Sequence, residues 1–191
     1  MNVLMLNGSQ VHDASAAIVH EVAAARLERA GWRVSSLLPA EMKIAPCTGC
    51  FGCWVRTPGT CVIDDEGRDV ARALVLSDLV LLITPVRFGG YSSALKKALD
   101  RIICVVSPSF MKIGGEVHHG PRYERYPSLV AVGILDRHDD DGTRVFKTLV
   151  RRNAINIHSP SHAAGVLAAG SSDGDIAALL DRLFQEAGVA V

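Results

Sequence analysis

The stretch NVLMLNGSQVHDASAAIVHEVAAARLERAG, residues 2–31, decides the fold. It opens with an almost unbroken apolar run, which suits a strand that is buried on both faces of a parallel sheet. A glycine–serine turn follows, and apolar residues then recur at helical spacing until Gly31, where a helix can stop. The stretch therefore predicts one strand–loop–helix unit of an α/β protein.

The same alternation repeats along the chain. Two further strand runs are clear, 78–85 and 128–135, and two are weaker, 32–38 and 155–159. Helical patterns lie between and after them, at 15–30, 65–77, 92–105, 141–153 and 173–187. Five alternations predict one domain over residues 1–191, with a doubly wound, five-stranded parallel sheet in three α/β/α layers. Ligands of such sheets bind beyond the carboxyl ends of the strands, near the point where the strand order reverses.

Composition narrows the class of protein. Apolar residues make up 49% of the chain and charged residues 21%, with 20 acidic and 20 basic side chains. This balance argues against a nucleic-acid-binding surface built on net charge. No apolar run approaches the roughly 20 residues of a membrane span, and the N-terminus lacks the features of a signal peptide. We therefore expect a cytoplasmic protein whose thiols are reduced.

The first strand-to-helix loop, residues 7–17, has the composition of a phosphate-binding turn. Gly8 permits a sharp turn, Ser9 and Ser15 offer hydroxyls, and the helix start presents free backbone N–H groups. The alternative is that Ser15 or Asp13 only caps the helix. Asp13 would repel a phosphate, so we expect it to face solvent. The loop matches neither the P-loop pattern nor G-x-G-x-x-G.

The loop that follows the third strand, within residues 84–101, could hold a flat, electron-accepting ring. Gly89 and Gly90 shape an exposed backbone, Phe88 and Tyr91 offer aromatic surface, and Arg87 places a cation at the mouth. The alternative interpretation is that Phe88 belongs to the core and that Arg87 is a solvated charge.

Four cysteines are crowded into residues 45–61 with the spacing C-x2-C-x2-C-x7-C: Cys47, Cys50, Cys53 and Cys61. This compact spacing can supply the four thiolates of a [4Fe–4S] cluster. Three alternatives remain. The thiols could bind zinc, although zinc ligands more often come in two separated pairs. They could instead be redox-active thiols or a disulfide, or they could bind nothing. The fifth cysteine, Cys104, lies in an apolar helical stripe and is predicted to be core. Residues 106–127 form a long interruption of the pattern, which we expect near a subunit contact or over the ligand site.

Three segments together carry a resemblance to a known family: NGS after the first strand, CTGCFGCWVRTPGTCVIDDEG after the second, and TPVRFGGYSSALKKALDR after the third. In this order they resemble the NADPH-dependent FMN reductase family, within the flavodoxin-like fold, and most closely the branch that includes iron–sulfur flavoproteins. Residues 1–135 carry the resemblance, and the rest follows the fold only.

The resemblance implies two sets of FMN-binding residues. Ser9, Gln10, Val11, Ser15 and Ala16 would bind the phosphate. A second set would line the isoalloxazine ring, and it consists of Pro85, Val86, Arg87, Phe88 and Gly89. Relatives often carry a basic residue near position 11 or 12, Thr at 16 and an aromatic at 87, so this chain departs from the pattern at those positions. The four cysteines of residues 45–61 would be [4Fe–4S] ligands.

The implied function is an FMN-dependent oxidoreductase that takes hydride from NAD(P)H and passes electrons to a small-molecule acceptor. The flavin supplies the chemistry, so no dedicated catalytic side chain is expected. One alternative is an iron–sulfur flavoprotein that moves single electrons from a ferredoxin-like partner. Another is a non-catalytic sensor that binds flavin or zinc. We expect a homo-oligomer, dimer or tetramer, without nucleic-acid or membrane partners.

Overall fold

The computed structural model describes all residues, 1–191, and contains one central sheet. Its strands are β1 (Asn2–Asn7), β2 (Arg33–Leu37), β3 (Leu79–Pro85), β6 (Ser128–Leu135) and β7 (His162–Ala168), all parallel and in the order β2-β1-β3-β6-β7. This is the flavodoxin-like arrangement, and it confirms the predicted fold. The strand order reverses between β1 and β3, where a ligand is expected.

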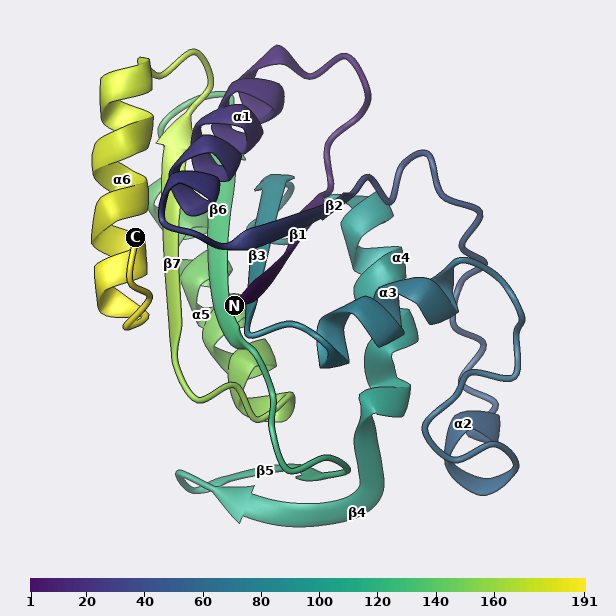
Figure 1. Ribbon diagram of the computed structural model, residues 1–191. Coiled ribbons are helices and arrows are strands. Elements are labelled where there is room, and N and C mark those ends of the chain that lie inside the picture. The colour runs from purple at the N-terminus through teal and green to yellow at the C-terminus, as the bar shows by residue number, and fades with distance from the viewer.

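Helices cover both faces of the sheet (Figure 1). On one face lie α1 (Ala14–Arg29) and α6 (Asp173–Glu186), which bury the side chains of alternate strand positions such as Val3 and Met5. On the other face lie α3 (Gly67–Val75), α4 (Ser93–Arg101) and α5 (Asp140–Asn156), which bury Leu4, Leu6 and their neighbours. No helix of the structure is both long and apolar enough to cross a membrane.

The fifth predicted strand exists but begins later than residues 155–159, which do not form a strand. Val150, Ala154 and Ile157 are buried at helical spacing, so the apolar residues of this stretch continue the core face of α5. His158 then adopts a left-handed conformation, with φ of 55°, and ends the helix. The true strand, β7, reads HAAGVLA, and its alanines and glycine gave no strand signal.

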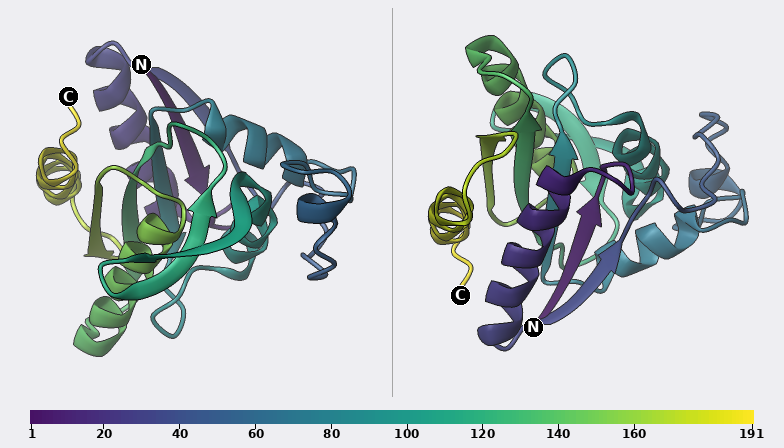
Figure 2. Two further views of the ribbon diagram at one scale, coloured as in Figure 1. Left: turned by 90° about the horizontal axis from the view of Figure 1, so that it is seen from below. Right: turned by 90° about the horizontal axis from the view of Figure 1, so that it is seen from above.

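Two short elements and a hairpin complete the chain. The cysteine loop contains the short helix α2 (Gly52–Val55), and α4 continues into a 3-10 turn, η1 (Ile102–Val105). Residues 106–121 form an antiparallel hairpin of β4 (Val106–Ile113) and β5 (Glu116–Pro121), which turns at two glycines. Seen from below, the hairpin crosses the end of the sheet, while α2 projects to one side (Figure 2). The hairpin lies at the end opposite the loop that opens α1, so within one chain it does not cover that loop (Figure 1).

Candidate functional site

The loop after β1 presents a row of free backbone donors. The N–H groups of Gln10, Val11 and His12 find no hydrogen-bond acceptor within the chain. These residues are exposed, so their donors are open to solvent. Consecutive free N–H groups beside a helix N-terminus form an anion-binding concavity. The loop therefore fits a phosphate through its backbone.

Several side chains of this loop are already engaged. The Asp13 carboxylate accepts a hydrogen bond from the Ala16 N–H at 3.1 Å and caps α1. Asp13 is half-buried and the alternative that it caps the helix is confirmed, so the Ala16 N–H is not available to a ligand. Ser9 is buried and its hydroxyl donates to the Gln10 carbonyl, while the Ser15 hydroxyl accepts from the Gly170 N–H. The free donors of the loop thus lie at Gln10–His12.

The loop after β3 exposes a strained aromatic residue. Phe88 is fully exposed and has a φ of 51°, a conformation that is unfavourable for a bulky side chain. The alternative that Phe88 belongs to the core is therefore wrong. Its N–H group and that of Gly89 have no acceptor in the chain. An apolar ring surface with two free donors at its base is a suitable contact for a planar heterocycle.

Two neighbours of Phe88 differ from the prediction. Val86 packs into the core and its N–H donates to the Ile134 carbonyl, so its side chain does not line the loop surface. Arg87 is exposed and forms an ion pair with Asp136, at 2.7 Å, from the loop after β6. The charge of Arg87 is thus partly neutralised. Pro85, the last residue of β3, is half-buried at the base of the loop.

The loops after β1 and β3 touch each other. The Ser92 hydroxyl donates to the Gly8 carbonyl, and it also accepts from the Leu95 N–H to cap α4. Thr84 accepts from the Ser92 N–H at 3.0 Å, which fixes the far side of the turn. A Cβ at Gly8 would come within 2.5 Å of the Leu95 Cβ. Glycine is therefore required where the two loops meet, and we call this pair of loops the switch-point site.

The cysteine loop encloses a second, separate cavity. Cys47, Cys50, Cys53 and Cys61 all line one small cavity together with Ile63, Ile103 and Arg101. Cys47 and Cys50 are exposed, Cys61 is half-buried and Cys53 is buried. Burial, reinforced by the neighbouring thiols Cys61 and Cys47, raises the pKa of Cys53, whereas a hydrogen bond from the Gly52 N–H lowers the pKa of Cys50. The four thiols thus line the same cavity but differ in exposure and in the direction of their pKa shifts.

Cys104 is buried, as predicted, and lies beside this group. Burial first, and then the thiols of Cys53 and Cys61, raise its pKa to about 11. No three His, Cys, Asp or Glu side chains converge on the position of a single metal ion. A [4Fe–4S] cluster instead takes its four thiolates around a cube of several irons.

A buried ion pair holds the two ends of the cysteine loop. The Arg101 side chain is completely buried and donates to the carbonyls of Ala45, at 2.7 Å, and Ile63, at 3.1 Å, which flank the cysteines. It also forms two hydrogen bonds of 2.8 Å with the Asp65 carboxylate. Burial by itself lowers the pKa of Arg101, but Asp65 and Cys61 outweigh it and the pKa lies above its ordinary value.

One donor of this buried cation is left over. The Arg101 Nε–H is buried without a hydrogen-bond partner, in a residue that lines the cavity of the four cysteines. An unpartnered buried donor is costly, and a ligand that accepts from it would remove that cost. Four thiols and a spare cationic donor are the chemistry that an anionic iron–sulfur cluster would use, but the cavity between them measures only about 20 Å³ and would have to widen around a cluster.

The switch-point site and the cysteine cavity lie at opposite ends of α4. Ser92 caps the first end, and Arg101 closes the other (Figure 1). The helix has nine residues, so at 1.5 Å per residue the two ends are roughly 13 Å apart. Within one chain, α4 therefore separates the thiols from the loops after β1 and β3.

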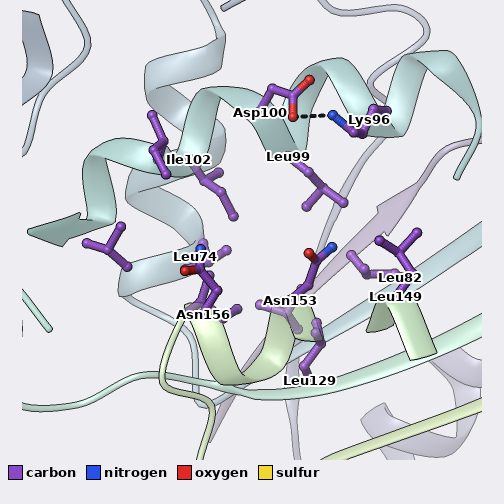
Figure 3. Close-up of a pocket in the computed structure, with 14 residues that line it drawn as sticks. Leu74, Leu82, Lys96, Leu99, Asp100, Ile102, Leu129, Leu149, Asn153 and Asn156 are labelled. Atoms are coloured by element: carbon purple, nitrogen blue, oxygen red, sulfur yellow. Dashed lines mark hydrogen bonds and ion pairs between the residues drawn. The ribbon is translucent and has the colours of Figure 1, made fainter. Parts of the chain in front are cut away.

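A third cavity, of about 210 Å³, lies between α4 and α5 (Figure 3). Leucines and isoleucines form most of its lining, and the Lys96–Asp100 ion pair stands at its edge on α4. Asn153 projects into it from α5, with its amide bound to the Tyr91 hydroxyl at 3.1 Å. Nothing in the sequence indicated this cavity, because its apolar residues are indistinguishable from core positions.

Comparison with known proteins agrees with this geometry. The family model of NADPH-dependent FMN reductases matches residues 1–123. Iron–sulfur flavoproteins of Methanocaldococcus jannaschii and Archaeoglobus fulgidus are 28% and 29% identical over 101 and 103 residues, which are 53% and 54% of this chain and 51% and 46% of those proteins. The chain thus spans about half the length of the curated relatives it matches.

Solved structures share the fold at low identity. An NAD(P)H:quinone oxidoreductase from Methanothermobacter marburgensis superposes with a TM-score of 0.69 at 13% identity, over 95% of this chain and 92% of that one. An azoreductase from Bacillus anthracis gives 0.67 at 11% identity, over 94% and 92%. At such identities the likeness shows the fold alone.

Proposed function

The chain belongs to the NADPH-dependent FMN reductase family, and from that premise we propose that it binds FMN at the switch-point site, takes hydride from NAD(P)H and passes electrons to a small-molecule acceptor. One observation carries the proposal: two loops with free backbone donors touch at the point where the strand order reverses.

Different residues would bind the phosphate and the ring of the cofactor. The N–H groups of Gln10–His12 would bind the phosphate, and Phe88 with its free N–H would contact the ring. When bound, FMN accepts a hydride and returns electrons singly or in pairs. Arg87, paired with Asp136, supplies a moderated positive charge near developing negative charge on the ring. The loop is open, so acceptors of varied shape, such as quinones, nitro or azo compounds, flavins or iron, can approach.

Flavin titration with a matched pair of variants tests this site. Phe88→Ala should weaken FMN binding about three- to tenfold, because the aromatic contact is lost. Phe51→Ala removes an aromatic residue of the cysteine loop that is also exposed, 61%, and also left-handed, with φ of 55°, and it should leave binding unchanged. Neither change should lower the free energy of unfolding by more than about 0.5 kcal/mol. Equal FMN affinities in the two variants, or no saturable binding at micromolar FMN, would exclude the site.

The electron donor and the acceptor are tested on the loaded protein. Oxidation of NADPH and NADH is followed at 340 nm with a quinone, a nitroarene or ferric iron added. We expect turnover with at least one nucleotide and one acceptor. Bound FMN without any nucleotide oxidation would favour a non-catalytic flavin sensor.

The cysteine cavity favours a second candidate function, an iron–sulfur flavoprotein that receives single electrons from a ferredoxin-like partner. Its support is the set of four thiols beside the spare donor of Arg101. After anaerobic reconstitution, about four irons and four sulfides per chain are expected. Cys61→Ser should lower that content, whereas Cys104→Ser should not. One zinc per chain without flavin would support a zinc sensor instead.

We also propose that the chain self-associates in the cytoplasm, as a dimer or tetramer, through the hairpin. Phe110, Met111 and Val117 are 68%, 44% and 63% exposed on its two strands. A cluster of exposed apolar side chains on a hairpin is typical of a contact surface. Light scattering should report an oligomer, and the double substitution Phe110→Ser and Val117→Ser should shift it toward the monomer.

A further inference from the structure

A cavity of about 310 Å³ lies between α3 and the last part of the cysteine loop, on the outer side of Cys61. Cys61 lines both this cavity and that of the four cysteines, so the two are neighbours that share one thiol. Arg68 and Arg72, one helical turn apart on α3, also line it. No function discussed above uses this cavity, and we call it the α3 cavity.

The positive charge around the α3 cavity exceeds the negative charge. No acidic residue lines it, and the Asp64 carboxylate pairs with Arg68 at 2.7 Å. Arg68 also donates to the Cys61 carbonyl at 2.8 Å, so its role is partly to hold the loop. Arg72 forms no hydrogen bond or ion pair through its side chain, and its guanidinium is free for a ligand.

A third arginine adds to this surplus. Arg122 donates through Nε to the carbonyl of Cys104, a residue that lines the cavity, while its Nη2 is buried and has no partner. Its side chain also lies against Gly59, another lining residue: a Cβ built there would be 3.5 Å from the Arg122 Cδ. Arg122 is half-buried and does not itself line the cavity, so it adds positive charge behind the lining residues Cys104 and Gly59.

Most of the remaining lining is apolar and includes Val75, Leu76 and Val105, while Thr60 and Tyr123 add hydroxyl groups. A surface that combines free guanidinium groups with aliphatic side chains matches a ligand with an anionic end and an apolar body. The volume lies at the lower end of the range for small-molecule sites, so the cavity can accept a body of one ring without filling completely. We propose that the α3 cavity binds a small aromatic carboxylate, with Arg72 as its main ionic contact.

This binding site is independent of the flavin and of any cluster. An occupant would cover one side of Cys61, which the second candidate function makes a cluster ligand. If the α3 cavity also holds the electron acceptor, that role rests on the proposed function. The binding of a carboxylate in the cavity does not.

Calorimetry with the flavin-free chain tests the site. Benzoate is the probe, benzamide its neutral counterpart and inorganic phosphate the bare anion. We expect saturable benzoate binding in the millimolar range or tighter, at least tenfold weaker binding of both other compounds, and an affinity for benzoate about tenfold lower in Arg72→Gln. Arg182→Gln, an exposed arginine of α6 on the opposite face of the sheet, is the matched control and should bind as the unmodified chain does.

Thiol protection gives a second readout. Benzoate should slow the alkylation of Cys61 by iodoacetamide, followed by mass spectrometry, and should leave Cys47 and Cys50 unaffected, because neither lines the α3 cavity. The proposal is overturned if benzoate does not bind at 10 mM, if Arg72→Gln binds it equally well, or if Cys61 is not protected at saturating benzoate. The FMN titration above is unaffected by any of these results, so a failure here is distinct from a failure of the proposed function.

Discussion

The two ends of α4 are built on different principles. At its N-terminal end, the switch-point site consists of exposed loops whose free donors are backbone N–H groups, and Phe88 projects into solvent. At its C-terminal end, a completely buried arginine and a carboxylate fasten the cysteine loop. The first end can admit and release a ligand without rearranging charge. The second is a fixed frame, held by the Arg101–Asp65 ion pair and by the hydrogen bonds from Arg101 to the carbonyls of the loop.

Among the changes that distinguish the two ends of α4, removal of the buried Arg101 guanidinium should lower the free energy of unfolding most. Arg101→Met leaves the Asp65 carboxylate without its partner, and we expect a loss of about 3–5 kcal/mol in the free energy of unfolding. Lys96→Met breaks an exposed ion pair with Asp100 on the same helix and should cost less than about 1 kcal/mol. Urea denaturation measures both. Similar losses in the two variants would contradict the fixed-frame interpretation.

The contact between the two loops at the other end is the next test. Gly8→Ala places a methyl group 2.5 Å from the Leu95 Cβ and 2.8 Å from the Ser92 hydroxyl, which should cost up to about 3 kcal/mol. FMN affinity should fall as well, because the loops are forced apart. Gly174→Ala in α6, where the nearest atom is 3.7 Å away, should be neutral or slightly stabilising. Unchanged FMN binding in Gly8→Ala would show that the loops need not meet.

Acid should reduce the stabilisation that the buried Asp65–Arg101 ion pair gives to the cysteine end of α4, whereas no such buried pair holds the switch-point end. The Arg101 guanidinium holds the pKa of Asp65 at about 2, below its ordinary 3.8. Because the pKa is lower in the folded state, the stabilisation is complete above about pH 4 and is lost as the pH falls toward 2; it amounts to about 2 kcal/mol. Between pH 5 and pH 2, the free energy of unfolding of Asp65→Asn should fall less steeply than that of the unmodified chain. Parallel curves for the two proteins would refute the assignment.

The smallest effect is expected at the cap of α1. Asp13→Asn keeps the side-chain oxygen that accepts from the Ala16 N–H but removes a negative charge beside the free donors. FMN affinity should rise about two- to fivefold at low salt, and the gain should shrink as salt is added. Riboflavin, which has no phosphate, should bind both proteins equally. An equal gain for riboflavin would place the phosphate elsewhere.

The pattern of the sequence anticipated the switch-point site better than the cysteine cavity. Gly8 and Ser92 belong to loops whose place follows from strand order alone, so their proximity was predictable. Asp13 was left between a cap and solvent, because a local cap competes with solvent for its carboxylate and spacing does not reveal which one prevails. Val86 was assigned to the ring by the resemblance, which carries residues over by position and does not reveal that this side chain turns into the core.

By itself, the sequence determined the sheet, its layers and the crowding of thiols, since these depend on periodicity and on neighbours along the chain. It could not determine that Arg101 is the buried counter-charge of a loop some 40–55 residues earlier, or that α4 separates the cysteines from the switch-point site. The arginines around the α3 cavity likewise come from separate segments. Only the tertiary structure decided these points. The burial and pairing of charges depend on which segments come into contact in space, and contacts between distant segments cannot be inferred from the residues that neighbour each charge along the chain.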